Sequence, residues 1–135
     1  MQQVHISKMT GKLDGFKAIS TNTITNDYCN KQHIKGKQDG QNICGDCYSH
    51  AMLNTYRKNM QASLQRNSDL LSSRPLEPQE IPRVVDRMFR FNAHGELINM
   101  QHFENLMAIV KDNPWCTFAL WTKRVDLVFR WLRDN

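Results

Sequence analysis

Hydrophobic residues along this chain follow two different spacings, and segments of the two kinds alternate. Three short segments are apolar at every second position or throughout, as β-strands are, and three longer segments carry apolar residues three or four positions apart, as helices do. The predicted strands are residues 15–21, 88–92 and 116–121, and the predicted helices are residues 47–72, 100–110 and 125–132. A further apolar piece, residues 4–6, is expected to pair with the first strand.

The order strand, helix, strand, helix, strand, helix is typical of right-handed βαβ units and a parallel sheet. Three units are too few for an eight-unit barrel, which needs at least about 200 residues. The sequence therefore predicts a single α/β domain over residues 1–135, either a small open sheet or a fold resembling the first half of a TIM-type barrel. In both cases functional groups are expected at the carboxyl ends of the strands.

Residues 22–42 separate the first strand from the first helix and contain almost no apolar residues. Their composition predicts a long irregular loop, and long loops inside compact domains usually serve a function. Three of the four cysteines, Cys29, Cys44 and Cys47, lie in or just after this segment. Two cysteines separated by two residues can direct both sulfurs to one centre, and a third completes three corners of a thiolate site. The sequence therefore predicts a metal-binding cysteine loop at residues 22–47.

The residues leave the identity of the metal open. An iron-sulfur cluster suits three thiolates and would leave one iron without a protein ligand. Zinc suits four ligands, and the spacing from Cys29 to His33 followed by the Cys44 and Cys47 pair is acceptable for a structural zinc site. His50 is a second candidate for the fourth zinc ligand. A disulfide is the third alternative, disfavoured because a reducing compartment is expected.

Composition and charge limit the class of protein. Hydrophobic residues make up 40% of the chain and charged residues 23%, which is an ordinary globular balance. No apolar run approaches the about 20 residues of a membrane span, and the first residues lack the pattern of a secretory signal, so a cytoplasmic location without a membrane partner is expected. The net charge of +5 permits a nucleic-acid partner, but no known nucleic-acid-binding motif supports one.

Three motifs connect the chain to a known family. They are CGDCYS at residues 44–49, FRFN at residues 89–92 and FALWTK at residues 118–123. In their order along the chain and in their residue patterns these motifs resemble the phage gene product 88 family, and the resemblance covers about residues 13–125. A phage origin would place the protein in the cytoplasm of the host cell.

The placement of the motifs also resembles the radical S-adenosylmethionine architecture. There, three cysteines after the first strand hold a 4Fe-4S cluster, and the free iron binds the amino and carboxylate groups of S-adenosylmethionine. A Gly-Gly-Glu turn after the second strand contacts the cofactor. The resemblance implies that Gly95 and Glu96, together with Asn92, contact the cofactor here, with His94 replacing the first glycine.

Two classes of function follow. One is an enzyme, or an enzyme-like remnant, that holds an iron-sulfur cluster and S-adenosylmethionine. The other is a non-enzymatic, zinc-stabilised basic phage protein that binds or inhibits a host protein or nucleoprotein. Because half a barrel exposes the edge of a parallel sheet, a homodimer or a missing second half is expected to cover that edge.

Three residues also have purely structural interpretations. Glu96 fits a favourable charge near the start of the next helix. Cys116 is predicted to be a buried apolar thiol. His102 lies off the apolar stripe of its helix and is predicted to face solvent.

Overall fold

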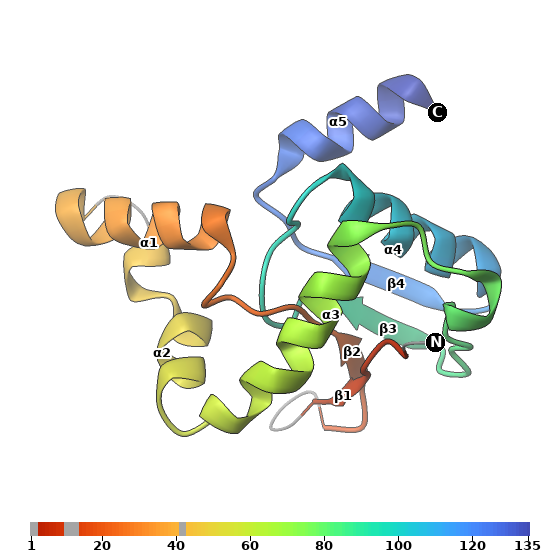
Figure 1. Cartoon of the computed structure of the whole chain (residues 1–135), viewed down its shortest axis with the longest axis horizontal. Helices are drawn as coiled ribbons and strands as arrows, with labels where there is room; N and C mark the ends of the chain where they lie inside the picture. Colours follow the sequence, from red (N-terminus) through yellow and green to blue (C-terminus); the bar gives the residue numbers. More distant parts are fainter. Residues whose placement is uncertain (1–2, 10–13, 41–42) are drawn as a thin grey trace.

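A computed structural model of the chain describes residues 3–9, 14–40 and 43–135. It contains a four-stranded sheet in which the strands follow one another in chain order (Figure 1). The strands are β1 (Ser7–Lys8), β2 (Lys17–Ile19), β3 (Met88–Phe91) and β4 (Thr117–Leu120). β1 runs antiparallel to β2, whereas β2, β3 and β4 are parallel. The prediction of a parallel sheet therefore holds for three strands, and the sheet as a whole is mixed.

Five α-helices and three short 3-10 turns complete the described fold. The helices are α1 (Asp27–Asp39), α2 (Tyr48–Asn54), α3 (Gln61–Ser73), α4 (Met100–Asp112) and α5 (Val125–Asp134). The 3-10 turns are η2 (Ile43–Asp46), η3 (Lys58–Met60) and η4 (Pro78–Glu80). Helices α3 and α4 lie beside the sheet, α5 contacts α4 on the side away from the strands, and α1 and α2 stand apart from the sheet on one side (Figure 1).

The prediction of an irregular loop over residues 22–42 was wrong, because α1 occupies most of its described part. The helix is mostly polar, and its few apolar residues form no stripe that a sequence pattern could detect. It begins where the side chain of Asn26 accepts a hydrogen bond from the Cys29 amide, and it ends at Gly40, which has a φ of 69°. Residues 41 and 42 of the predicted loop lie outside the described residues.

The prediction of one helix over residues 47–72 was also wrong, because the chain leaves the helical path at Thr55. The Thr55 hydroxyl donates to the carbonyl of Ala51 at 2.8 Å, a local bond with which threonine competes with the helix ladder. The Arg57 amide then donates to the Met52 carbonyl at 2.9 Å and closes a turn. The predicted helix is therefore two helices, α2 and α3, which point in different directions (Figure 1).

The hydrophobic core lies between one face of the sheet and helices α3, α4 and α5. Its buried members include strand and helix residues: Ile19, Phe89, Phe91, Leu70, Leu71, Phe103, Leu106, Ile109 and Leu127. Because side chains alternate along a strand, the opposite face of the sheet carries Ala18, Arg90 and Ala119, which are paired in register. Helices thus cover one face, and the other face borders the cavities described below.

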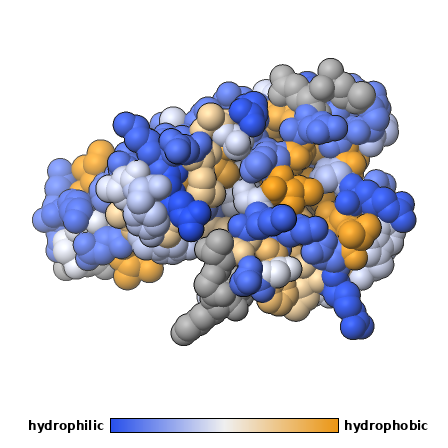
Figure 2. Space-filling model, turned by 90° about the horizontal axis from the view of Figure 1, so that it is seen from below, coloured by the Kyte–Doolittle hydropathy of each residue, from blue (hydrophilic) through white to orange (hydrophobic). Residues whose placement is uncertain are grey.

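A half-barrel arrangement stays a prediction. The outer edge of β4 pairs with no further strand within the described ranges, as an interrupted barrel requires. Trp121, directly after β4, is 81% exposed, and Figure 2 shows further hydrophobic residues between charged ones over the half of the molecule that holds the sheet. None of the described helices combines the length and the hydrophobicity that crossing a bilayer requires.

Two buried asparagines form hydrogen bonds with the loops that surround helix α4. Asn105 accepts from the Leu76 amide and donates to the carbonyls of Leu71 and Arg74. Asn113 makes the equivalent set of bonds: it accepts from the Val84 amide and donates to the carbonyls of Pro82 and Ile109. Each side chain thereby forms hydrogen bonds with backbone groups that would otherwise be buried without a partner.

His102 does not face solvent as predicted, because α4 contacts both α3 and α5 and has little free surface. Its side chain is fully buried, and Nδ1 accepts a hydrogen bond from the Ile98 amide at 3.1 Å. The ring proton is therefore assigned to Nε2, which has no partner among the described residues. Burial lowers the pKa of His102 to about 4.

Acid is expected to destabilise the protein through His102. The unfolded state has a histidine pKa near 6.5 and binds more protons than the folded state between about pH 6.5 and pH 4. The free energy of unfolding should therefore fall by about 3 kcal/mol across this range and change no further through this residue at lower pH. Urea unfolding as a function of pH measures the effect. His102→Gln should flatten the curve and the matched variant His5→Gln should not, and an unchanged slope in His102→Gln would contradict the assignment.

Candidate metal-binding site

Three cysteines line one cavity of about 200 Å³ beside the carboxyl ends of β2 and β3. Cys29 lies in the first turn of α1, Cys44 in η2, and Cys47 caps α2. None of the three forms a disulfide with a described residue. The structure thus brings together the sulfurs that the sequence placed in one segment. The same cavity is lined by the other candidates named from the sequence, His33, His50, Asn92, Gly95 and Glu96, and by Lys123, which the sequence did not indicate.

Asn26 positions Cys29 relative to the turn after β3. Its side-chain oxygen accepts from the Cys29 amide at 2.9 Å, which caps α1. Its side-chain nitrogen donates to the Glu96 carbonyl at 3.0 Å. One buried amide therefore joins the helix that carries Cys29 to the segment that carries Glu96.

Gly45 positions the other two cysteines. It lies between them and packs directly on the backbone of α1, since an added Cβ would lie 2.7 Å from the carbonyl carbon of Gly36. Only glycine permits this approach. The close contact holds Cys44 and Cys47 against the helix that provides Cys29.

A hydrogen-bond chain joins α2 to the strand ends. The Ser49 hydroxyl lies 2.7 Å from the Thr23 hydroxyl and 2.6 Å from Nδ1 of His94. The Gly95 amide donates to the Thr23 hydroxyl at 2.8 Å. Ser49 is two residues after Cys47, so this chain fixes the start of α2 against the segments that follow β2 and β3.

The charges in the cavity act on the thiols in opposite directions. Burial raises the pKa of Cys29 to about 12, and Glu96 and the two other cysteines contribute to the increase. The Lys123 ammonium donates to Sγ of Cys44 at 2.7 Å, and this bond raises the pKa of Lys123. Without a further positive charge in the cavity, the Cys29 thiol stays protonated, and a metal ion would supply that charge.

Glu96 is buried, and both of its carboxylate oxygens are engaged. Oε1 accepts from the Leu97 amide at 2.8 Å and from the Thr122 hydroxyl, and Oε2 accepts from the Lys123 amide at 2.9 Å. Glu96 therefore joins the turn after β3 to the loop after β4 and holds Lys123 beside Cys44. This role differs from the predicted charge near a helix start.

Asn92 is the polar group of the cavity whose hydrogen-bonding capacity is unused. It follows β3 with a φ of 58° and is only 6% exposed. Neither its side-chain oxygen nor its side-chain nitrogen has a hydrogen-bond partner in the described part of the chain. Buried amides are nearly always paired, so an amide without a partner beside a cavity suits contact with a ligand.

His33 and His50 stack at the outer side of the cavity, with ring centroids 3.8 Å apart. Nδ1 of His33 lies 2.8 Å from the Cys44 carbonyl, which can only accept, so the proton is assigned to Nδ1. Nε2 of His33 then carries the lone pair, as in histidines that bind metals. Burial, followed by the nearby charges of His33 and Lys37, lowers the pKa of His50.

The ligand side chains share the cavity without meeting around one point. Among the residues that the structure describes, no three His, Cys, Asp or Glu side chains are placed to hold a single metal ion. Cys116 lies outside the cavity and is partly exposed, not buried as predicted. Sequence reasoning missed the contact between Lys123 and Cys44, because nothing in the chain signals a bond across 79 positions.

Comparison with known proteins places the chain in a family. A family model described as gene product 88 matches residues 24–135. No curated protein and no solved structure matches the chain. The matched region contains the three cysteines of the cavity as well as Asn92, Glu96 and Lys123. Because the match covers most of its length, the chain belongs to the gene product 88 family of bacteriophage proteins.

Proposed function

We propose that this protein binds an iron-sulfur cluster through Cys29, Cys44 and Cys47. The observation that carries the proposal is the cavity itself, which three thiols from α1, η2 and the start of α2 line beside the carboxyl ends of parallel strands. Three thiolates are the usual protein ligands of a 4Fe-4S cluster with one open iron.

A cluster and a single zinc ion require different distances between the sulfurs. Zinc-sulfur bonds are about 2.3 Å long, so the sulfurs of a zinc site lie within about 4 Å of one another. In a cluster, each cysteine binds a different iron, and the sulfurs stand further apart. The three thiols line one cavity of about 200 Å³, and a cluster bound there would hold their sulfurs further apart than a single ion would.

A bound cluster would supply electron transfer and an open coordination position for a second ligand. S-adenosylmethionine is the candidate for that ligand. Within the cavity, Asn92 has a free amide to contact it, whereas the carboxylate of Glu96 is already engaged in holding Lys123. We therefore assign Asn92 to ligand contact and Glu96 to positioning Lys123, whose ammonium offsets negative charge at Cys44.

Zinc is the second candidate, and one observation favours it. The hydrogen bond between His33 and the Cys44 carbonyl leaves Nε2 of His33 free to bind a metal, which is the arrangement of a zinc-binding histidine. A zinc ion held by His33 and the three cysteines would be structural and would hold α1 against α2.

Protein purified without oxygen separates the two candidates. We expect a brown sample with broad absorption near about 400 nm that bleaches on reduction, together with iron and sulfide in the protein. His33→Ala should leave iron content and absorption almost unchanged, as should the control variant His5→Ala. A colourless protein with about one zinc per chain, most of it lost in His33→Ala, would instead establish the zinc site.

A further inference from the structure

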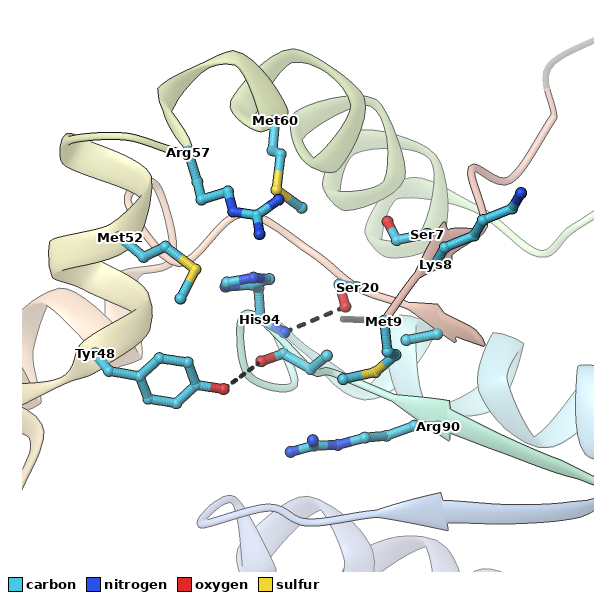
Figure 3. Close-up of a pocket in the computed structure, with 12 residues that line it drawn as sticks. Ser7, Lys8, Met9, Ser20, Tyr48, Met52, Arg57, Met60, Arg90 and His94 are labelled. Carbon is cyan, nitrogen blue, oxygen red and sulfur yellow. Dashed lines mark hydrogen bonds between the residues drawn. The ribbon is translucent and has the colours of Figure 1, made fainter. Parts of the chain in front are cut away.

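A second cavity, of about 290 Å³, lies beside the cysteine cavity and shares Tyr48, Arg90 and Ala93 with it. Figure 3 shows its construction. Arg57, from the segment between α2 and α3, projects toward His94, and Arg90 extends from β3 on the other side of His94. The two guanidinium groups therefore come from elements that only the tertiary fold brings together.

No carboxylate of the described residues neutralises the positive charge in this cavity. No described residue that lines it is acidic. The described chain shows no ion pair between a carboxylate and either Arg57 or Arg90. Burial first, and then both arginines, lower the pKa of His94, as expected of a positively charged surrounding. Two guanidinium groups beside a partly buried histidine favour an anion.

The cavity also offers an unused hydroxyl and an apolar wall. The Ser7 hydroxyl is buried and has no hydrogen-bond partner in the described residues. The lining also includes three methionines, Met9, Met52 and Met60, which lie among the charged side chains (Figure 3). Methionine side chains are polarizable and adapt to flat or irregular apolar groups. The lining thus combines donors for an anion with a surface for an apolar body.

We propose that this cavity binds a small molecule that carries a phosphate monoester and a compact aromatic or apolar body, of about the size of a nucleoside monophosphate. A carboxylate has two oxygens and is satisfied by one guanidinium fork. Arg57, Arg90 and the Ser7 hydroxyl offer more donors than that, and they come from three separate parts of the fold, which suits the three terminal oxygens of a phosphate.

This ligand would lie next to the cysteine cavity, because Arg90 and Tyr48 border both spaces. The proposed binding uses none of the cysteines, so it does not depend on a bound metal. A bound phosphate compound would place its body within reach of any chemistry at the neighbouring centre. The two proposals can therefore fail separately.

Calorimetric titration with adenosine monophosphate, adenosine and inorganic phosphate tests the site. Adenosine monophosphate should bind, and adenosine should bind at least about tenfold more weakly. Arg57→Gln and Arg90→Gln should each raise the Kd for adenosine monophosphate by about tenfold or more. Lys58→Gln is the matched control, because it removes one positive charge next to Arg57 from a side chain that does not line the cavity. Its Kd should stay within about twofold of the unmodified protein.

Equal affinity for adenosine and its monophosphate, equal effects of Arg57→Gln and Lys58→Gln, or no binding of any phosphate compound would overturn the proposal. Thermal unfolding of each variant excludes a loss of binding through misfolding. A 5′-phosphorylated oligonucleotide separates the two sources of this chemistry: tighter binding than adenosine monophosphate identifies the end of a nucleic acid, and weaker binding identifies a free nucleotide. Protein with and without bound metal should give the same Kd.

Discussion

Cys29→Ser is expected to abolish tight metal binding. Structural zinc in small sites contributes roughly 10–16 kcal/mol through four ligands, so losing one thiolate costs about 3 kcal/mol, or about a 100-fold loss of affinity. We expect a similar loss of affinity for a cluster. Cys29 is the only one of the three ligands on α1, and Cys44 and Cys47 lie in η2 and at the start of α2. Metal content of protein purified without oxygen, before and after dialysis against a chelator, measures it.

Cys116→Ser is the control for this experiment, because it removes a thiol outside the cavity. It should keep the full metal content. Since both candidate metals use Cys29, this variant tests the site and not the metal, which His33→Ala distinguishes. If Cys29→Ser retained as much metal as Cys116→Ser, the three-cysteine site would be wrong.

Gly95→Ala is expected to cause a larger loss of stability than the same replacement at Gly15, Gly40 or Gly45. Gly95 has a φ of 87°, and an added Cβ would lie 2.1 Å from the hydroxyl oxygen and 2.8 Å from the carbonyl oxygen of Thr21. Thr21 is fully buried, and its amide is bonded to the His94 carbonyl. The backbone cost of about 1 kcal/mol and the overlap of about 2–3 kcal/mol together predict a loss of about 3–4 kcal/mol.

Gly15→Ala separates these two costs. Gly15 has a similar φ of 95°, but an added Cβ would meet no atom within 4 Å. It should therefore lose only the backbone cost of about 1 kcal/mol. Urea unfolding of both variants gives the difference. Equal losses would show that the segments carrying Thr21 and Gly95 can move apart without a cost in the free energy of unfolding. These segments would then not form a rigid edge of the cavity.

The contact with Thr21 also gives Gly95 a packing role of its own. The resemblance to radical S-adenosylmethionine proteins implied cofactor contact for Gly95 and Glu96. In the structure, Gly95 permits the close approach of two strand ends, and Glu96 fastens the loop that carries Lys123. Contact with a cofactor stays a prediction for both, and the unpaired amide of Asn92 is the stronger candidate.

Local patterns were sufficient for the second half of the chain. Strands β3 and β4 and helices α4 and α5 lie where the spacing of apolar residues predicted them, within about two residues at each end. These elements pack directly on the core, and burial on one face imposes the periodic pattern that the sequence shows. The cysteines could also be identified as a group from their spacing alone.

Helix α1 and the split between α2 and α3 could not be predicted, because neither depends on an apolar stripe. A side-chain cap at Asn26 and a backbone contact between Gly36 and Gly45 hold α1 in place, and the hydroxyl of Thr55 competes with the helix ladder. Burial of His102 was missed for a related reason, since helices on two sides of α4 hide residues off the main stripe.

The sequence by itself determined the alternation of strands and helices and the chemistry available, three thiolates and two histidines in one segment. Only the tertiary structure decided what surrounds those groups. It placed Lys123 beside Cys44, left the side chain of Asn92 without a hydrogen-bond partner among the described residues, and set Arg57 and Arg90 around a neighbouring cavity. The physical reason is that periodicity records which residues are buried, whereas a site depends on contacts between distant segments, and these leave no periodic trace in the chain.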